Sequence, residues 1–220
     1  MKDLIIGAIT GYNFDQVKPW LNSIKKSGFT GDIALVCYNI SYETAEFLEK
    51  EGVILFAFEK DDAGKRYIYK HDFQICLHRF IHYWNFLKDL KYEYRYLIAT
   101  DVKDVIFQRN PVEFLERTLH DKVLNVSSES LKYKDEPWGV NNMTQSFGTF
   151  FYEHLKDRII INCGVLAGRS EYMLDLFLKI FLVCSGSPMR VLGGGGPDQA
   201  ALNILMSTST YQDITNIAIS

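Results

Sequence analysis

Between residues 95 and 111 the chain reads Arg-Tyr-Leu-Ile-Ala-Thr-Asp-Val-Lys-Asp-Val-Ile-Phe-Gln-Arg-Asn-Pro. The nearly continuous apolar run from Tyr96 to Ala99 is typical of a strand that is covered on both faces of an α/β sheet. Asp101 and Asp104 follow at the carboxyl end of this strand, where ligands of open α/β sheets bind. Two carboxylates across a turn can face one hard cation, which in turn can hold a diphosphate. A pair of solvated turn aspartates is the alternative, because the spacing is common.

The bulk composition is that of an ordinary enzyme domain. The 220 residues are 47% hydrophobic and 14% aromatic, which is enough for one sizeable core. The formal net charge is −3 and the basic residues are scattered, so the sequence predicts no nucleic-acid partner. The four cysteines have neither CxxC nor zinc-finger spacing, which favours buried thiols in a reducing compartment. We see no signal peptide and no membrane segment, and we expect a cytoplasmic protein of a microbe or of a virus-infected host cell.

The first half of the chain alternates apolar runs with amphipathic segments. We expect strands over residues 4–9, 32–38 and 53–58, and helices over about 15–26, 42–50 and 71–87. Strands joined by helical crossovers indicate a parallel sheet. The loop after the first strand lacks the GxGxxG fingerprint, which disfavours a Rossmann dinucleotide site.

The second half is more irregular. Asn110 and Pro111 form a good helix start, with Glu113 closing a capping box. Further strands are expected over 122–126 and 158–162, a polar, turn-rich loop over 127–144, and a buried helix over 170–184 that begins at a Ser170 cap. Trp138 in that loop is either an ordinary half-buried side chain or an acceptor platform. Pro197 at a first helical position would place Asp198 in the first turn, where the helix dipole favours the ionised carboxylate.

Three segments resemble GT-A-fold, nucleotide-sugar-dependent glycosyltransferases. Residues 100–111 are similar to the acidic-motif segment of that fold. Ile161-Asn162-Cys163-Gly164-Val165-Leu166 is similar to the Asn-Ala-Gly-Val-Leu segment, and residues 198–203 to the Asp-Gln-x-x-Leu-Asn segment, of glycogenin-like and bacterial lipopolysaccharide galactosyltransferase families. Order and rough spacing agree, and the segments span most of the chain. A narrower likeness is to the amino-terminal domain of chlorovirus proteins that glycosylate the viral capsid.

The resemblance implies an α/β fold of the GT-A (Rossmann-like) type, with a central, mostly parallel mixed sheet flanked by helices. Residues 1–220 would form a single domain, with a nucleotide-binding part over about 1–110 and an acceptor part over about 111–220. The sequence stops at Ile219-Ser220 without a polar tail, which suggests a domain cut from a longer protein.

The resemblance also implies site residues. Asp101 and Asp104 would bind Mn²⁺ or Mg²⁺, and the metal would bridge the diphosphate of a UDP-sugar donor. The nucleotide would contact Thr10, Gly11, Tyr12, Arg79, Asp101, Val102 and Lys103. The donor sugar would contact Asn162, Cys163 and Gly164, and the catalytic residues would be Asp198 and Gln199.

Several of these residues have plainer alternatives. Tyr12 can be a rim aromatic instead of a ring that stacks on the base, and Arg79 can form a surface ion pair instead of binding phosphate. Asp198 can be an ordinary N-terminal acid of its helix.

The implied activity is the metal-dependent transfer of a hexose or deoxyhexose from a UDP-sugar to a hydroxyl of a glycan or glycoprotein. The chain departs from the family in having Asp-x-x-Asp instead of Asp-x-Asp and in lacking a carboxy-terminal His-x-x-Gly-x-x-Lys-Pro-Trp segment, which leaves the third metal ligand open. Stereochemistry is open too, because Gln199 near the anomeric carbon fits retention and Asp198 as a base fits inversion. A sugar-nucleotide nucleotidyltransferase and a nonenzymatic carbohydrate-binding domain are the alternative functions. The first usually carries a Gly-rich basic loop near its amino terminus, and the second needs no acidic turn.

Overall fold

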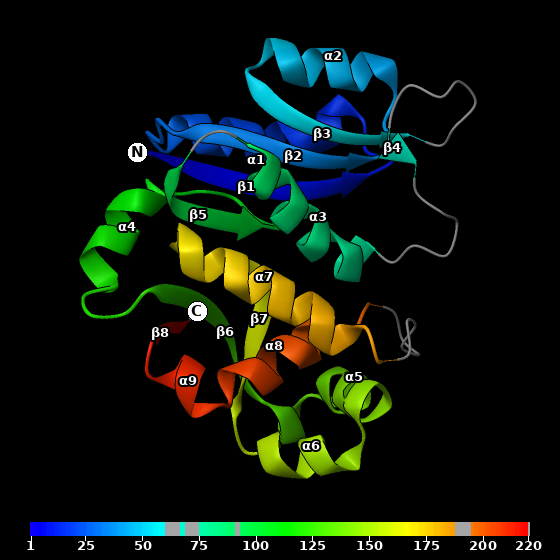
Figure 1. Cartoon of the computed structure of the whole chain (residues 1–220), viewed down its shortest axis with the longest axis vertical. Coiled ribbons are helices and arrows are strands. Elements are labelled where there is room, and N and C mark those ends of the chain that lie inside the picture. The colour runs from blue at the N-terminus through cyan, green and yellow to red at the C-terminus, as the bar shows by residue number, and fades with distance from the viewer. Residues whose placement is uncertain (60–66, 69–74, 91–92, 188–194, 220) are drawn as a thin grey trace.

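The centre of the protein is a sheet of eight strands in the order β4-β3-β2-β1-β5-β7-β6-β8 (Figure 1). The structure, a computed structural model, describes residues 1–59, 67–68, 75–90, 93–187 and 195–219. The strands are β1 (Lys2–Thr10), β2 (Asp32–Tyr38), β3 (Val53–Glu59), β4 (Tyr67–Ile68), β5 (Tyr94–Thr100), β6 (Leu124–Lys132), β7 (Ile159–Arg169) and β8 (Thr215–Ile219). All neighbours pair in parallel except β7, which runs antiparallel to β5 and β6. The predicted mostly parallel mixed sheet is therefore confirmed.

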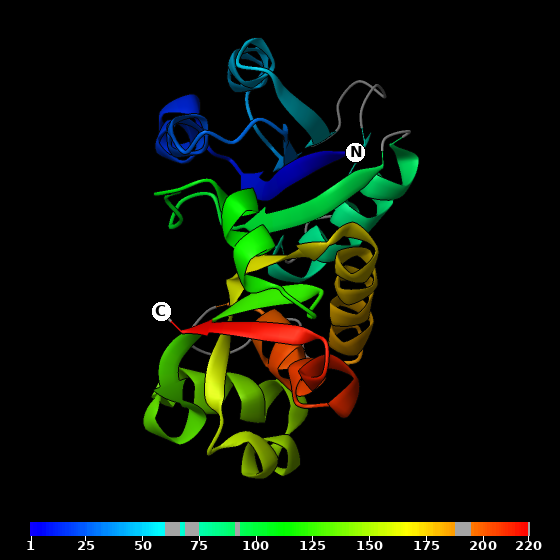
Figure 2. The same cartoon turned by 90° about the vertical axis from the view of Figure 1, so that its left-hand side faces the viewer.

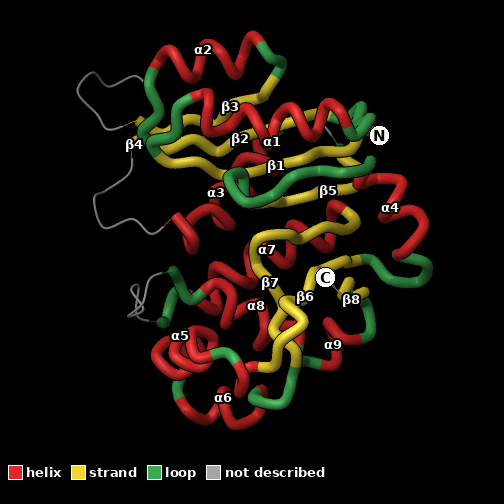
Figure 3. Tube along the Cα trace, turned by 180° about the vertical axis from the view of Figure 1, so that it is seen from behind, coloured by secondary structure: helices red, strands yellow, loops and turns green. Residues whose placement is uncertain are grey.

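Helices cover both faces of this sheet. They are α1 (Phe14–Lys26), α2 (Tyr42–Lys50), α3 (Ile75–Asp89), α4 (Pro111–Thr118), α5 (Pro137–Phe147), α6 (Thr149–Leu155), α7 (Ser170–Cys184), α8 (Asp198–Met206) and α9 (Ser209–Gln212). The helices α3 and α7 lie on one side and α1 and α2 on the other, as the side view in Figure 2 and the rear view in Figure 3 show. None of the helices in the described ranges is long and apolar enough to cross a membrane.

The two helical layers create two apolar cores. The larger one lies between the sheet and α3, α7 and α8, where the rings of Phe80 and Tyr83 contact Phe177 at centroid distances of 5.9 and 5.4 Å. The other lies under α1, α2 and α4. Leu97 and Ile98 are neighbours on β5 but belong to opposite cores and are 0% and 2% exposed. This double burial explains why the strand reads as a continuous apolar run.

Helix α1 anchors the end of β5. Asn13 is the N-cap of this helix, and its side chain and that of Gln16 form a reciprocal capping box. Its Trp20 is fully buried, and the indole N–H donates a 2.9 Å hydrogen bond to the hydroxyl of Thr100. Val102 packs in the same core beside Gly7, where a Cβ would lie 2.6 Å from a Val102 methyl carbon. The turn that carries the acids is thus fixed on both sides of Asp101.

Most predicted elements of the first half are confirmed. The bounds of β2 and α2 agree with the predicted 32–38 and 42–50, and α4 begins at Pro111 with Asn110 as N-cap. Helix α3 is described from Ile75 on, and residues 71–74 of the predicted helix lie outside the described residues.

The predicted loop over 127–144 is wrong. Strand β6 continues to Lys132, and residues 137–147 form helix α5. The carboxylate of Glu136 accepts N–H bonds from Trp138, at 3.1 Å, and Gly139, so it caps this helix. The polar composition of α5 hides the helix because it breaks the usual apolar spacing.

Three boundaries of the second half also differ from their predictions. Strand β7 runs from Ile159 to Arg169 instead of ending near Asn162. Ser170 is the first residue of α7 and Arg169 its N-cap, so the predicted serine cap is wrong. Pro197 is the N-cap of α8, which makes Asp198 the first helical residue.

The contact between Trp20 and Thr100 predicts a stability cost. Thr100→Val keeps the shape of the side chain but leaves the buried indole N–H without its acceptor, and we expect a loss of about 1–3 kcal/mol in the free energy of unfolding. Urea unfolding of Thr100→Val, Trp20→Phe and the double variant checks this. Because the two side chains share one bond, the double variant must lose less than the sum of the single losses, and additive losses contradict the prediction.

A half-buried histidine predicts a pH dependence of stability. His82 on α3 makes a 2.7 Å hydrogen bond with the hydroxyl of Tyr38, and burial, together with nearby His78, lowers the pKa of His82 from 6.5 to about 4. The unfolded chain therefore binds the proton at a higher pH than the folded one, so stability falls as the pH drops from about 6.5 toward 4. Thermal unfolding across this window should show a weaker pH dependence for His82→Asn than for wild type. His120→Asn, at an exposed position, is the control and should retain the wild-type slope.

Candidate active site

The site begins at the carboxyl ends of β1 and β5. These strands are parallel neighbours with Gly7 opposite Thr100, so the loop after Thr10 and the turn after Thr100 lie at the same edge of the sheet. Gly11 has a φ of +63°, a conformation that favours glycine, and its N–H donates to the carbonyl of Tyr38 at 2.9 Å. The predicted nucleotide loop therefore turns back over the sheet edge with Thr10 and Gly11 exposed.

Tyr12 lies in the electric field of both predicted metal ligands. Burial, then the carboxylate of Asp104, then that of Asp101 raise the pKa of the Tyr12 hydroxyl. The Tyr12 hydroxyl is therefore close enough to Asp101 and Asp104 to be influenced by their charges. Asp104 is exposed, whereas the Asp101 side chain is 41% exposed.

Arg79 joins three parts of the site. Its guanidinium donates to Asp101, to Asp198 at 3.0 Å and to the carbonyl oxygen of Cys163 at 3.2 Å. Arg79 therefore forms ion pairs, as the plainer alternative held, but its side chain is only 13% exposed, so the pairs are largely buried and not on the surface. Burial by itself would lower the pKa of Arg79, but Asp198 and Asp101 more than offset this effect and raise it. Contact of Arg79 with phosphate stays a prediction.

Asp198 is a buried partner of this arginine. It is 6% exposed and stands at the start of α8. Burial raises the pKa of its carboxyl, and Arg79 opposes the rise while the negative charge of Asp101 adds to it. These are the contacts of a group that positions its neighbours, and the catalytic role of Asp198 stays a prediction.

The predicted sugar-binding residues lie in an irregular part of β7. Val126 of β6 pairs with Leu166 whereas the next residue, Ser127, pairs with Asn162, so Cys163, Gly164 and Val165 are extra residues on β7. A Cβ on Gly164 would lie 2.7 Å from Asp101 Oδ2 and 2.8 Å from Asn162 Oδ1. Any larger residue at position 164 would collide with the Asp101 carboxylate and the Asn162 amide oxygen, so this arrangement requires glycine.

The structure adds Glu129, which the sequence analysis missed. The amide nitrogens of Asn162 and Gln199 both donate to Glu129 Oε1 at 3.1 Å. The oxygens of the same two amides accept the N–H groups of Gly164, at 2.6 Å, and Cys163, at 3.3 Å. No signal in the sequence pointed to Glu129, because it is a single acid outside any recognised motif and lies in a segment that we predicted to be a loop.

Other predicted residues lie apart from these contacts. The Val102 side chain is 3% exposed and belongs to the core, so only its backbone is left to face a nucleotide. Lys103 is exposed. Trp138 is half-buried against Gly195, where a Cβ would lie 3.0 Å from the indole ring. This burial agrees with the plainer of its two interpretations, and the acceptor platform stays a prediction.

The acids fit a metal only in part. Within the described residues no group of three or more His, Cys, Asp and Glu side chains is arranged to hold an ion. Asp101 gives one carboxylate oxygen to Arg79, which leaves the other and the carboxylate of Asp104. Two carboxylates suit Mg²⁺ or Mn²⁺ when substrate phosphates and water complete the coordination. Metal binding at Asp101 and Asp104 stays a prediction, and it would require a diphosphate and water to supply the remaining ligands.

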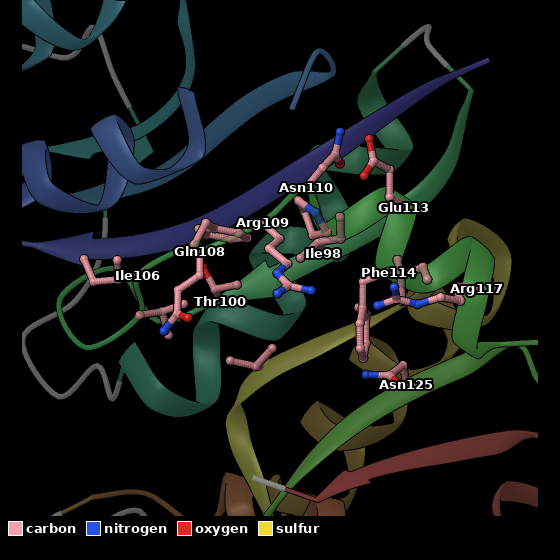
Figure 4. Close-up of a pocket in the computed structure, with 16 residues that line it drawn as sticks. Ile98, Thr100, Ile106, Gln108, Arg109, Asn110, Glu113, Phe114, Arg117 and Asn125 are labelled. Carbon is pink, nitrogen blue, oxygen red and sulfur yellow. The ribbon is translucent and has the colours of Figure 1, made fainter. Parts of the chain in front are cut away.

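A separate cavity of about 570 Å³ opens on the face of the sheet that carries α1 and α4 (Figure 4). Its lining is mostly apolar, and Arg109 and Arg117 are exposed cationic side chains at this cavity. Thr100 and Val165 belong to the lining and directly adjoin Asp101 and Gly164 in the sequence. The sequence analysis singled out neither arginine.

Comparison with known proteins shows the fold. No family model and no curated protein sequence matches the chain. Among solved structures, 280 chains match, and one of them is the apo form of the bifunctional glycosyltransferase WbbM, with a TM-score of 0.59 and 13% sequence identity. The match covers 97% of this chain but 38% of WbbM. The chain thus has the Rossmann-like fold of part of a glycosyltransferase, as predicted, while the likeness to chlorovirus proteins gains no support.

Gly164 gives a prediction for the site. Gly164→Ala should push the Asp101 carboxylate and the Asn162 amide apart and cost about 1–3 kcal/mol of stability, since overpacking forces neighbours to shift. Gly186→Ala is the matched control, because a Cβ there meets nothing within 4 Å. Its stability should equal the wild type or exceed it slightly. Urea unfolding measures the stability of both variants. If Gly164→Ala is as stable as Gly186→Ala, Asp101 and Asn162 can move aside without loss of stability and the prediction is wrong.

Proposed function

We propose that the protein is a metal-dependent glycosyltransferase that moves a hexose or deoxyhexose from a UDP-sugar to a hydroxyl of a glycan or glycoprotein. The observation that carries the proposal is one continuous polar site at the carboxyl edge of the parallel strands. It runs from Tyr12 and the two acids through Gly164 to the amides of Asn162 and Gln199. The likeness of the fold to part of a glycosyltransferase agrees with this function.

The two ends of the site suit the two halves of a nucleotide sugar. Asp101 and Asp104 would hold Mn²⁺ or Mg²⁺ together with the diphosphate, and the bound cation would neutralise negative charge on the departing nucleotide. The ring of Tyr12, whose hydroxyl feels the charges of both acids, would be available to stack on the base. The amides beyond Gly164 offer hydrogen bonds to the hydroxyls of the sugar.

Arg79 and Asp198 act in this proposal by positioning Asp101. The guanidinium already binds two carboxylates and a carbonyl, so it holds the turn after β5 against β7 and α8. Such a fixed arrangement keeps the reacting groups aligned without reorganisation during the reaction. Gln199 stays close to the sugar through its bonds to Cys163 and Glu129.

In the transfer itself, the bond between the anomeric carbon and the diphosphate oxygen breaks and the acceptor oxygen bonds to that carbon. The acceptor hydroxyl proton is transferred to a base.

The cytoplasmic location expected from the sequence is part of the same proposal.

The test is calorimetric titration of UDP into the protein with and without Mn²⁺. We expect binding that requires the metal in wild type and is weakened about tenfold or more in Asp104→Ala, because one of two carboxylate ligands is lost. Asp104 is exposed, so the variant should fold. Asp213→Ala removes another exposed acid, just before β8, and should bind UDP as wild type does. Release of UDP from UDP-sugars then measures turnover.

Other outcomes separate the alternatives. Binding of GDP or dTDP in place of UDP keeps the glycosyltransferase and changes the donor. Turnover of a nucleoside triphosphate with a sugar phosphate indicates a nucleotidyltransferase. Glycan binding without any nucleotide or metal indicates a carbohydrate-binding domain.

A further inference from the structure

Glu129 lies where two irregular strands face each other. On β6, Ser128 pairs with Ile161 and Lys132 with Ile159, so three residues of β6 stand opposite one residue of β7. On β7, Cys163 to Val165 form the extra segment described above. Ser130 has a φ of +55°, which is a strained conformation for a residue other than glycine. Bulges and strain of this kind redirect side chains and gather at functional sites.

The contacts of Glu129 fix the orientation of both amides. Because a carboxylate only accepts hydrogen bonds, the groups that face it at 3.1 Å are the amide nitrogens of Asn162 and Gln199. Their oxygens are held by the backbone N–H groups of Gly164 and Cys163. Both bonds to Glu129 reach Oε1, and Oε2 accepts no bond from these amides.

The cluster of Glu129, Asn162 and Gln199 is negatively charged. Its two other members are neutral amides, and none of the ion pairs between described residues includes Glu129. Arg79, the cation that the described part of the site contains, is bound to Asp101 and Asp198. A ligand next to Glu129 therefore meets a carboxylate that no described cation neutralises.

This cluster adjoins the diphosphate end of the site. Asp101 Oδ2 and Asn162 Oδ1 both lie within 3 Å of the point where a Gly164 side chain would start, at 2.7 and 2.8 Å. Asn162 in turn donates to Glu129. A nucleotide sugar with its diphosphate at Asp101 would thus extend its sugar over Gly164 toward Glu129, an argument that rests on the proposed function.

We propose that Glu129, Asn162 and Gln199 form the subsite for the transferred sugar and select a neutral sugar over a sugar acid. Hydroxyl groups donate to the carboxylate and accept from the amide hydrogens that remain. The carboxylate of a uronic acid has no proton to donate and meets a like charge, so the site rejects it by repulsion.

The experiment compares UDP, UDP-glucose and UDP-glucuronic acid by competition binding in the presence of Mn²⁺. The two sugars differ only at the carbon that carries the carboxylate. Wild type should bind UDP-glucose about tenfold or more tightly than UDP-glucuronic acid. In Glu129→Gln, which keeps the shape and one acceptor oxygen, the ratio should approach one while the affinity for UDP itself is unchanged. Glu171→Gln removes the same charge from an exposed position in the first turn of α7 and should keep the wild-type ratio.

The outcomes distinguish this inference from the proposed function. If UDP binds but wild type does not discriminate, or if Glu129→Gln discriminates as wild type does, the inference is overturned and the glycosyltransferase proposal stands. If UDP does not bind, the UDP-dependent function itself fails. Should Glu129→Gln not fold, the salt dependence in wild type decides: discrimination by charge must weaken between 0.05 and 0.5 M salt, and a constant ratio overturns it.

Discussion

The guanidinium of Arg79 between the carboxylates of Asp101 and Asp198 is the interaction on which the site depends. It connects α3, the end of β5 and the start of α8, and a further bond to Cys163 includes β7. Asp198 is buried, and without the arginine it would be an uncompensated charge next to a second carboxylate. Because breaking such a pair is strongly destabilising, these four elements can pack together only in a way that keeps the cation in place.

The antiparallel direction of β7 places Asn162, Cys163 and Gly164 beside the end of β5, where Asp101 pairs with Arg79. Since β7 runs antiparallel to β5, its Gly164 carbonyl accepts the N–H of Asp101 at 2.8 Å. The residues of β7 and of β6 that lack a partner on the other strand lie on either side of the Ser127–Asn162 and Ser128–Ile161 pairs. The irregular segment of β7 contains Gly164 and directly follows Asn162, and that of β6 contains Glu129, so the regular pairing of the two strands is interrupted where the amide cluster forms.

The cavity beneath the acidic turn has a different origin. Helix α4 and the segment before it cover β5 from the side of α1, and the rest of that face stays open around Val165 and Asn125. Thr100 lines this cavity, and Asp101 of the candidate site follows it directly in the sequence. A ligand in the cavity would therefore lie close to the site without sharing its carboxylates.

Sequence patterns predicted the parts of the fold that depend on local burial. The strand at residues 94–100 and helices α1, α2 and α4 could be predicted from apolar runs and caps. In these elements the buried positions carry apolar residues and the helix starts carry capping residues, so the local sequence is enough to identify them. Helix α5 could not, since its stripe is polar and its start depends on Glu136. The acids at the end of β5 and the Asn162 to Gly164 segment were also visible as motifs.

The sequence by itself determined a mostly parallel α/β sheet and the place of the acids at its edge. Only the tertiary structure decided that Arg79 would be buried between two acids and that Glu129 would bind the amides of Asn162 and Gln199. These contacts join residues from 22 to 119 positions apart in the chain. Local propensity acts over a few residues, whereas a pairing of buried charges is fixed only when all the elements that carry them have packed.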